Sequence, residues 1–122
     1  PSPEDFLPNP LPSDLYEHVF MADLDREINQ SSFTFAGRIP ATLAGSDPTG
    51  KAVGDCLPPS LWDPLSYSVT TTAVTRKPTP ASGHFYTHGS HDAFHRCLVM
   101  PLSKDGKNVD FVLGAVSFKP LQ

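Results

Sequence analysis

The sequence predicts an α+β fold, in which short helices and one longer helix pack on one face of a five-stranded antiparallel sheet. The main observation is that residues 81–119 read as three consecutive strands. They are separated by two turn signals, Gly89-Ser90 and Asp105-Gly106, where glycine supplies the positive φ that tight hairpin loops need. Two more strand-like segments stand near the start of the chain, and a helical stretch lies between the two groups. Sequential strand pairs of this kind favour an antiparallel sheet with its helices on one face.

Length and charge limit what the protein can be. The chain has 122 residues, enough for one domain with its own core. Its formal net charge is -4 and its nine basic residues are scattered, which argues against nucleic acid as a partner. No apolar run approaches the roughly 20 residues of a membrane span, and no signal peptide is visible. The two cysteines, Cys56 and Cys97, read as a reduced pair, so we expect a cytoplasmic protein without nucleic-acid or membrane partners.

The first part of the chain is rich in proline. Five of the first twelve residues are proline, which predicts an extended lead-in over residues 1–17. Within it, Ser13 is placed to cap a short helical turn. The domain proper is expected over residues 18–122.

Two strands are expected at the start of the domain. The first covers residues 18–23 and the second residues 31–37, with Phe33 and Phe35 on one face of the second strand. The segment between them, residues 24–30, is charged and polar, as a hairpin loop should be.

The middle of the chain reads as helical. Residues 38–59 alternate short apolar pieces with glycine and proline, which indicates one-turn helices and loops. One long helix is expected to begin with Asp63 as its N-cap and Pro64 at its first position, and to stop at Pro78. Its apolar stripe consists of Leu61, Leu65, Val69 and Ala73.

The loop Gly89-Ser90 decides which face each side chain of the following strands occupies. A two-residue loop places Tyr86 opposite Ala93, and side chains alternate along a strand. One face then carries His84, His88, His91 and His95. The other face, which we predict to be the core, carries Phe85, Phe94, Leu98, Met100, Leu102, Val109, Phe111 and Leu113.

The histidine face allows two further interpretations. It also carries Val99, Val112, Val116 and Phe118, too much apolar surface to leave in water. A preceding helix or a second copy must cover it, and we expect a homodimer through this outer face of the sheet.

A metal site on the histidine face is the second interpretation. The two cross-strand pairs of histidines lie about 13 Å apart along the strands, so one ion cannot join all four. A site would need His88 with His91, or His84 with His95 and Cys97. Solvent-exposed polar side chains are the alternative, and we expect no metal. A change of one residue in the loop length would turn the histidines inward and restore a haem or metal pocket.

Two features of the sequence partly match enzyme motifs, but each lacks a residue or turn that the chemistry needs. Residues 45–52, GSDPTGKA, nearly match a phosphate-binding loop, but Ala52 has no hydroxyl for magnesium and Asp47 would place a negative charge beside phosphate. A simple turn is expected there. Serine, histidine and aspartate are abundant, yet no serine sits in a strained Gly-x-Ser-x-Gly turn. We therefore expect no catalytic residues.

Several segments carry a family resemblance: PSPEDFLPNPLPSDLYEHVFMADLD, FTFAGR, GSDPTGK, LVMPLSKDGKNVD and VLGA. With the order of elements, they resemble a PAS domain, and more narrowly the alphaproteobacterial PAS-like family of unknown function. The resemblance implies a small-molecule-sized pocket between the sheet and the helices, and sensing of a ligand or dimerisation as the function. The family has a helical stretch ahead of this lead-in, so the resemblance also implies a chain trimmed at its N-terminus.

Arg96 marks the expected pocket. On the predicted core face it lies between Phe94 and Leu98, where a guanidinium needs an anionic partner. The alternative is that it reaches solvent or pairs with Asp63 or Asp92. Aromatic residues with one charge are typical of small-ligand sites. The ligand-binding residues that we expect are Arg96, Trp62, Tyr67, Phe35 and Phe94.

The sequence thus predicts a non-catalytic sensory module that binds a small ligand or dimerises, with no cofactor identified. One alternative is an interaction module without a ligand, in which its own side chains fill the pocket. The other is a metal-binding sensor that uses the histidine face.

Overall fold

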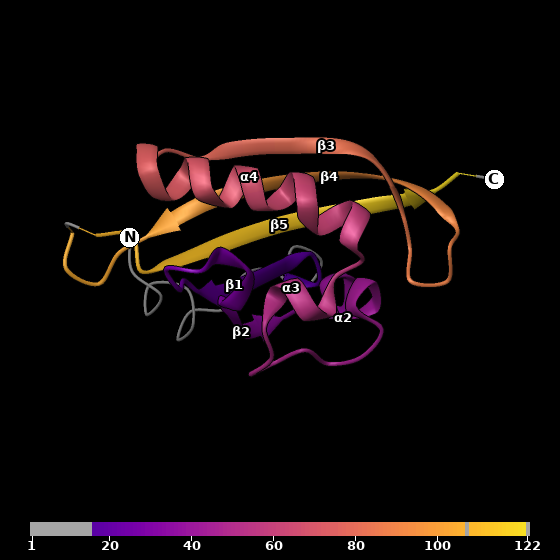
Figure 1. Ribbon diagram of the computed structural model, residues 1–122, viewed down its shortest axis with the longest axis horizontal. Helices are drawn as coiled ribbons and strands as arrows, with labels where there is room; N and C mark the ends of the chain where they lie inside the picture. The colour runs from indigo at the N-terminus through magenta and orange to yellow at the C-terminus, as the bar shows by residue number, and fades with distance from the viewer. Residues whose placement is uncertain (1–15, 107, 122) are drawn as a thin grey trace.

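The computed structural model describes residues 16–106 and 108–121. It contains a five-stranded antiparallel sheet in the order β2-β1-β5-β4-β3, with helices on one face (Figure 1). The strands are β1 Val19–Asp23, β2 Ser32–Ala36, β3 Thr79–Tyr86, β4 Asp92–Leu102 and β5 Phe111–Pro120. The helices are η2 Ile28–Gln30, α2 Arg38–Ala44, α3 Val53–Cys56 and α4 Pro59–Thr75. The predicted α+β class and all five strands are confirmed.

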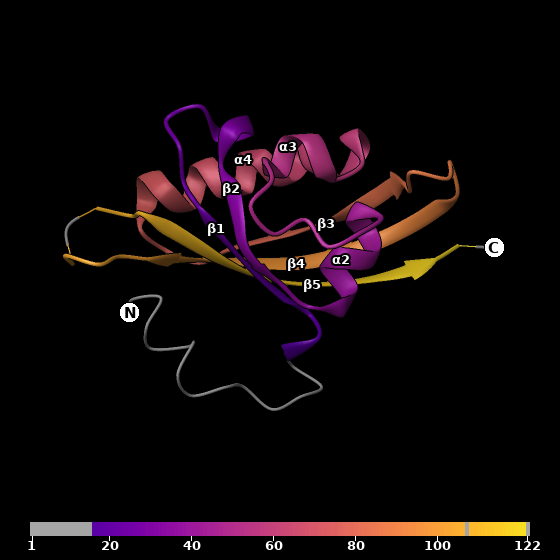
Figure 2. The same cartoon turned by 90° about the horizontal axis from the view of Figure 1, so that it is seen from below.

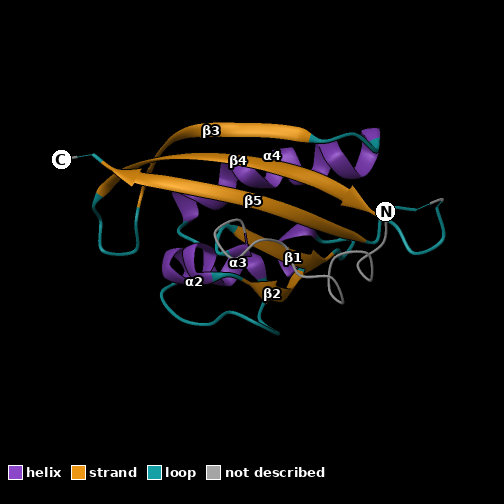
Figure 3. Cartoon of the chain, turned by 180° about the vertical axis from the view of Figure 1, so that it is seen from behind, coloured by secondary structure: helices purple, strands orange, loops and turns teal. Residues whose placement is uncertain are grey.

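The sheet separates two layers of side chains. Figure 2 shows α3 and α4 on one side of β3, β4 and β5, and in Figure 3 these three strands stand in front of α4. We call the side that carries the helices the inner face and the other side the outer face. Within the described residues, no helix has both the length and the apolar composition that crossing a membrane requires.

A β-bulge divides the two phenylalanines of β2 between the faces. Met21 pairs with Phe35 but Ala22 pairs with Phe33, so Thr34 is an extra residue in the ladder. Phe33 packs edge-on against Phe20 on the inner face, with ring centroids 5.6 Å apart. Phe35 belongs to the outer face. The expectation that both share one face is wrong, because the bulge interrupts the alternation of side chains.

Helix α4 begins five residues earlier than expected. Pro58, not Asp63, is the N-cap, and its carbonyl accepts hydrogen bonds from the backbone of Leu61 and Trp62, both 2.9 Å long. Pro64 therefore lies inside the helix, on its exposed side. The early start buries Leu61 and Trp62, and this burial offsets the backbone hydrogen bond that a proline inside a helix cannot make.

The predicted apolar stripe of α4 is the face that packs on the sheet. The buried residues of the helix are Leu61, Trp62, Leu65, Ser68, Val69 and Thr72, while Ala73 is half-buried. The helix ends at Thr75 because Arg76 adopts a left-handed conformation with φ of 62°. The stop expected at Pro78 is thus reached slightly earlier.

The loop between β3 and β4 has three residues instead of the expected two. The backbone N–H of Thr87 donates to His91 O, and that of Ser90 donates to Thr87 O, which closes a turn over residues 88–90. Ser90, not Gly89, takes the positive φ, at 63°. This is the common three-residue hairpin, in which a turn is followed by one left-handed residue.

The longer loop inverts the faces of β4 and β5. Phe85 now pairs with Ala93, and Gly83 pairs with His95. A slip of one residue moves every side chain of a strand to the opposite face. The inner residues of these two strands are Ala93, His95, Cys97, Val99, Val112, Val116 and Phe118. Those predicted to be core but found on the outer face are Phe94, Leu98, Met100, Leu102, Phe111 and Leu113. Phe85 is in the core as expected, and Val109 lies in a loop.

The second predicted turn is part of a longer connection. Gly106 has the expected positive φ, 75°. However, β4 ends at Leu102 and β5 begins at Phe111, so the connection spans residues 103–110 instead of two residues. Hydrogen bonds of Asp105 with Ser103 and Asn108 hold this connection in shape.

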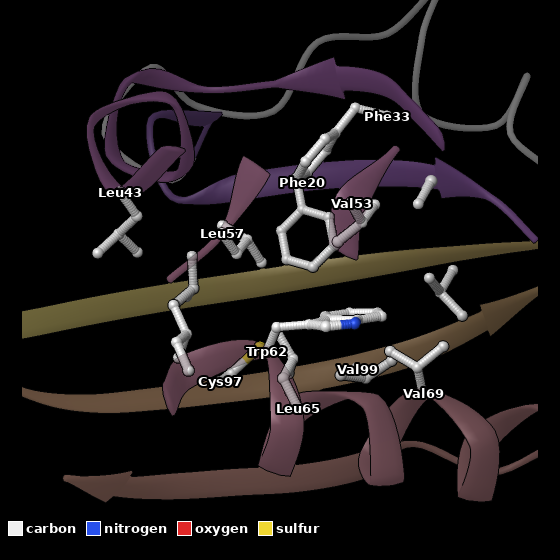
Figure 4. Packing of buried hydrophobic residues seen from close by; sticks show 14 of the residues in the cluster. Phe20, Phe33, Leu43, Val53, Leu57, Trp62, Leu65, Val69, Cys97 and Val99 are labelled. Carbon is white, nitrogen blue, oxygen red and sulfur yellow. The ribbon is translucent and has the colours of Figure 1, made fainter. Parts of the chain in front are cut away.

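The main core lies between the helices and the inner face. Figure 4 shows Trp62 among Phe20, Leu65 and Val99 at its centre. Gly114 of β5 makes this packing possible, because a Cβ there would come within 2.3 Å of the Phe20 ring. A second cluster on the outer face contains Val19, Met21, Leu102 and Leu113 with Phe35, Met100, Phe111 and Ala115.

Candidate functional site

The interior below the helices is filled by the protein's own side chains. A small cavity enclosed by described residues measures about 10 Å³. It is lined by Phe20, Phe33, Pro40, Leu43, Leu57, Leu61, Leu65 and Val116. That volume is at the lower limit for a single water molecule. Trp62 occupies the space beside it and donates a 2.5 Å hydrogen bond from Nε1 to Asn29 Oδ1.

The structure does not bring the five predicted ligand residues together. Trp62 is in the core, whereas Tyr67 is 78% exposed on the opposite side of α4. Phe35 is on the outer face of β2, at the far edge of the sheet. Only Arg96 and Phe94 are neighbours, and they lie on the outer face of β4. Their placement on a core face was wrong because of the longer β3–β4 loop.

The outer face of β3 and β4 exposes several large apolar side chains. Phe94 is 37% exposed, Leu98 39% and Tyr86 53%. With Arg96, which is also exposed, we call these residues the open sheet face. It replaces the outer patch that we expected from Val99, Val112, Val116 and Phe118, since those four side chains lie on the inner face.

A hollow of about 420 Å³ lies on this face between β3 and β4. It is lined by Pro80, Ala81, Ser82, Phe94, Arg96 and Cys97. The hollow exists because Ser82 is small and lies directly opposite Arg96 in the sheet. Within residues 16–106 and 108–121, the Arg96 guanidinium has neither an ion pair nor a hydrogen-bond partner.

The other charged and titratable groups near the open sheet face are Asp92, His84 and Lys119, and Lys119 of β5 lies directly opposite Phe94. His84 Nε2 lies 3.1 Å from Asp92 Oδ1, and both side chains are about half exposed. The imidazole of His84 also contacts the Tyr86 ring edge-on, with centroids 5.6 Å apart. Asp92 thus pairs with His84, and Arg96 does not take part in the predicted pairing with Asp92 or Asp63.

The four histidines do not share a face. His95 is buried on the inner face, while His84 is on the outer face. His88 Nε2 donates to the backbone carbonyl of Cys56 across a 2.6 Å contact, which fastens the hairpin loop to α3. In the described part of the chain, no three histidine, cysteine or acidic side chains are placed to hold a metal ion. The proposed pairing of His84 with His95 in a metal site is therefore wrong.

His95 is the most unusual side chain of the core. It is only 1% exposed, and neither of its ring nitrogens has a hydrogen-bond partner within the described residues. Its nearest ring is Phe85, with centroids 5.7 Å apart, and Gly83 lies opposite. Burial lowers the pKa of His95, so the neutral imidazole is favoured. The sequence suggested inward histidines only if the loop length differed by one residue from the expected two. The loop found is one residue longer, and it turns His95 inward but leaves His84 on the outer face.

The two cysteines are free and poorly suited to nucleophilic chemistry. Burial raises the pKa of the Cys97 thiol to about 12. Burial also raises the pKa of Cys56. A thiolate is the reactive form, and neither environment favours it.

Residues 45–52 form turns, as expected. Gly45 ends α2 with φ of 89°, and Gly50 has φ of 82°. Asp47 Oδ1 accepts hydrogen bonds from the backbone N–H and the hydroxyl of Thr49, at 3.1 and 2.7 Å. The carboxylate is thus occupied in closing the turn, and it would repel a phosphate.

No protein-family profile matches the chain. No curated protein matches it either. Solved structures do match, and light-oxygen-voltage (LOV) and PAS domains are among them.

Three of these similar structures illustrate the likeness. A LOV domain studied with a flavin analogue is 14% identical with a TM-score of 0.60, over 87% of this chain and 78% of that one. The LOV domain of the blue-light photoreceptor Aureochrome1 is 16% identical with a TM-score of 0.58, over 90% and 85%. A PAS domain from Colwellia psychrerythraea is 11% identical with a TM-score of 0.58, over 86% and 91%. The chain therefore has the PAS fold, and the narrower alphaproteobacterial family is not shown.

Proposed function

We propose that this chain is a non-catalytic, cytoplasmic PAS-type sensory module that signals by pairing of its open sheet face with a second copy. The observation that carries this proposal is the exposure of Phe94, Leu98 and Tyr86 on one sheet face. Clustered exposed apolar side chains mark contact surfaces. The filled interior supports the proposal, since it favours an interaction module over one that holds a ligand inside.

A flavin does not fit the interior. One of the similar LOV domains was studied with a flavin analogue, which makes this group the first to test. Sites for drug-sized ligands measure about 300–1,000 Å³. The interior cavity here is about 10 Å³. The indole of Trp62 and the apolar side chains around it occupy the space that such a ligand would need.

Opposite charges on the open sheet face are placed so that they could pair between two copies of the chain. Asp92 and Arg96 lie on the same face of β4, two residues before and two residues after Phe94. In a twofold dimer the same patch meets itself in reverse. Two copies stacked antiparallel about Phe94 would therefore place each Arg96 near the partner's Asp92. This arrangement would give the unpaired guanidinium an acidic neighbour.

Replacement of Phe94 by aspartate tests the dimer. We expect the wild-type protein to be dimeric at high concentration and the Phe94→Asp variant to dimerise at least about tenfold more weakly, because it buries a charge at the interface centre. Sedimentation equilibrium measures both dissociation constants. Tyr67→Asp, on the exposed side of α4, is the matched control and should leave dimerisation unchanged.

Charge reversal tests the expected pairing of Arg96 with Asp92 of the second copy. Arg96→Asp alone should weaken the dimer, and adding Asp92→Arg should restore it, since the two charges are exchanged. A wild-type protein that stays monomeric at high concentration would contradict the proposed function. Native mass spectrometry of the same samples reports any bound small molecule, and one retained by the Phe94→Asp variant would favour the ligand-binding alternative.

A further inference from the structure

The two edges of the sheet are protected to different degrees. At the β2 edge, Phe33 exchanges backbone hydrogen bonds with the following loop: its N–H donates to Lys51 O, and its carbonyl accepts from Gly50 N. Val53 N donates to Ser31 O beside them. At the opposite edge, β4 is the only strand among the described residues that pairs with β3. The β3 edge is therefore the one where backbone groups remain available.

One hydrogen-bonded pair shows which groups of β3 point away from the sheet. Tyr86 N donates to Ser60 Oγ at 2.8 Å, and Ser60 Oγ donates to Tyr86 O at 3.1 Å. The backbone of Tyr86 thus points outward from β4. Backbone groups alternate in direction along an antiparallel strand, so those of Ser82 and His84 point outward as well. Among the described residues, no backbone or side-chain group is hydrogen-bonded to them on that side.

The middle of β3 lacks the features that usually prevent another strand from pairing with an edge strand. Natural edge strands are commonly protected by charged residues, bulges, proline or short length. β3 is eight residues long, regular in its pairing with β4, and free of lysine, arginine, aspartate and glutamate. Its single proline, Pro80, is near the start, and the Ser60 contact protects only the end. In Figure 1, β3 forms the outer margin of the sheet beside α4.

The hollow beside this edge favours an acidic side chain on an added strand, because Arg96 lines it. A strand added to β3 would place one side chain over Ser82, and Arg96 lies on the next strand in the same row. The added strand and β4 would be about 10 Å apart, two strand spacings. An arginine and a glutamate can span this distance together over a serine. Arg96 has no ion-pair partner in the described residues, so an acidic side chain is the one that fits.

We propose that β3 accepts an extended segment of another protein as a sixth strand, with an acidic side chain opposite Ser82. This mode of recognition gains affinity from backbone hydrogen bonds and specificity from side-chain pockets. It goes beyond the proposed function, which pairs the open sheet face with a second copy and does not use the backbone edge of β3; Arg96 belongs to both surfaces.

A second copy of β3 fits this edge less well. In an antiparallel pairing centred on Gly83, Ser82 would face the partner's His84, which is not acidic. Pro80 would face the partner's Tyr86, but Pro80 has no N–H and the backbone of Tyr86 is already bonded to Ser60. Only the Ser82 and His84 backbones would then form new hydrogen bonds.

The test uses a blocked peptide of alternating threonine and valine with one central glutamate, placed on the same side as the threonines. We expect the amide resonances of Ser82 and His84 to shift on titration and to become protected from hydrogen exchange. A peptide with glutamine at the centre, and the Arg96→Gln variant with the original peptide, should each bind several-fold more weakly because the charge pair is lost.

The Ser82→Pro variant distinguishes binding at the β3 edge from binding at the open sheet face. It removes one outward N–H at a position where an edge strand tolerates proline, and it should weaken binding by about tenfold. Ser82→Ala keeps the N–H and is the matched control, expected to bind like wild type. A peptide whose backbone nitrogens facing β3 are N-methylated cannot donate these hydrogen bonds, and it provides the same test without altering the protein.

Three results would overturn the inference. The first is that the amide resonances of Ser82 and His84 do not shift at saturating peptide. The second is that the N-methylated peptide binds as tightly as the original one. The third is self-association that Ser82→Pro abolishes, which would place a second copy on the edge. Failure of peptide binding with dimerisation still sensitive to Phe94→Asp would leave the proposed function standing.

Discussion

Replacement of Trp62 by alanine is expected to lower the free energy of unfolding by about 3–5 kcal/mol, the usual cost of removing a large buried aromatic side chain. Trp62 is at the centre of the main core, between α4 and the inner face. Its indole also donates a hydrogen bond to Asn29, which would lose its partner. Urea denaturation followed by circular dichroism measures the change.

Two controls separate the contributions of Trp62. Trp62→Phe keeps most of the apolar contact but removes the hydrogen bond, and it should cost less than the alanine variant. Tyr67→Ala removes an aromatic side chain from the exposed side of the same helix and should change stability by no more than about 0.5 kcal/mol. Equal losses for Trp62→Ala and Tyr67→Ala would show that the indole does not fill the core as described.

Replacement of His95 by leucine is expected to stabilise the protein by about 1–3 kcal/mol at neutral pH. A buried polar group without a hydrogen-bond partner costs about that much, and an apolar side chain of similar size avoids it. Both ring nitrogens of His95 are buried without partners in the described residues. Chemical denaturation of the two proteins measures the difference, and a loss of stability would show that the imidazole has a partner after all.

The same residue predicts sensitivity to acid. Burial lowers the pKa of His95 in the folded state, whereas the unfolded chain keeps the ordinary value near 6.5. Below that pH the unfolded state binds the additional proton, so the stability from the neutral imidazole is present above about pH 6.5 and is lost as the pH falls towards the folded pKa. The loss reaches at most about 1.4 kcal/mol per pH unit. His95→Leu should remove this part of the pH dependence.

His84 is the matched control for the acid experiment. It is half exposed and lies beside Asp92 on the outer face, so His84→Gln should retain the acid-sensitive component assigned to His95. Unfolding free energies measured from pH 7.5 to 5 in all three proteins give the comparison. An equal pH dependence in wild type and His95→Leu would contradict the assignment.

Local patterns in the sequence were sufficient to predict the elements of the fold. The strands follow from short apolar segments between turn residues, and the face of α4 follows from the spacing of Leu61, Leu65 and Val69. The turns of residues 45–52 follow from their glycines. These features depend on neighbours a few residues apart along the chain.

The errors in the predicted site have two local causes. Ser90 in a left-handed conformation lengthens one hairpin loop by a residue, and Thr34 adds a residue to β2. Each change is small in local energy, yet each reverses the direction of the side chains around it. Arg96, Phe94 and Phe35 were therefore assigned to a pocket that they do not line.

The sequence by itself determined the order of the strands and helices, because alternation and helical spacing are local properties. Only the tertiary structure decided which face of β4 became the core. Small side chains at Ala93, Cys97 and Val99 leave room for Trp62 and Leu65 below α4, whereas the face with Phe94 and Leu98 would overfill that space. This choice depends on the volume between the helix and the sheet, which no local pattern contains. It places His95 in the core and leaves Arg96 on the surface.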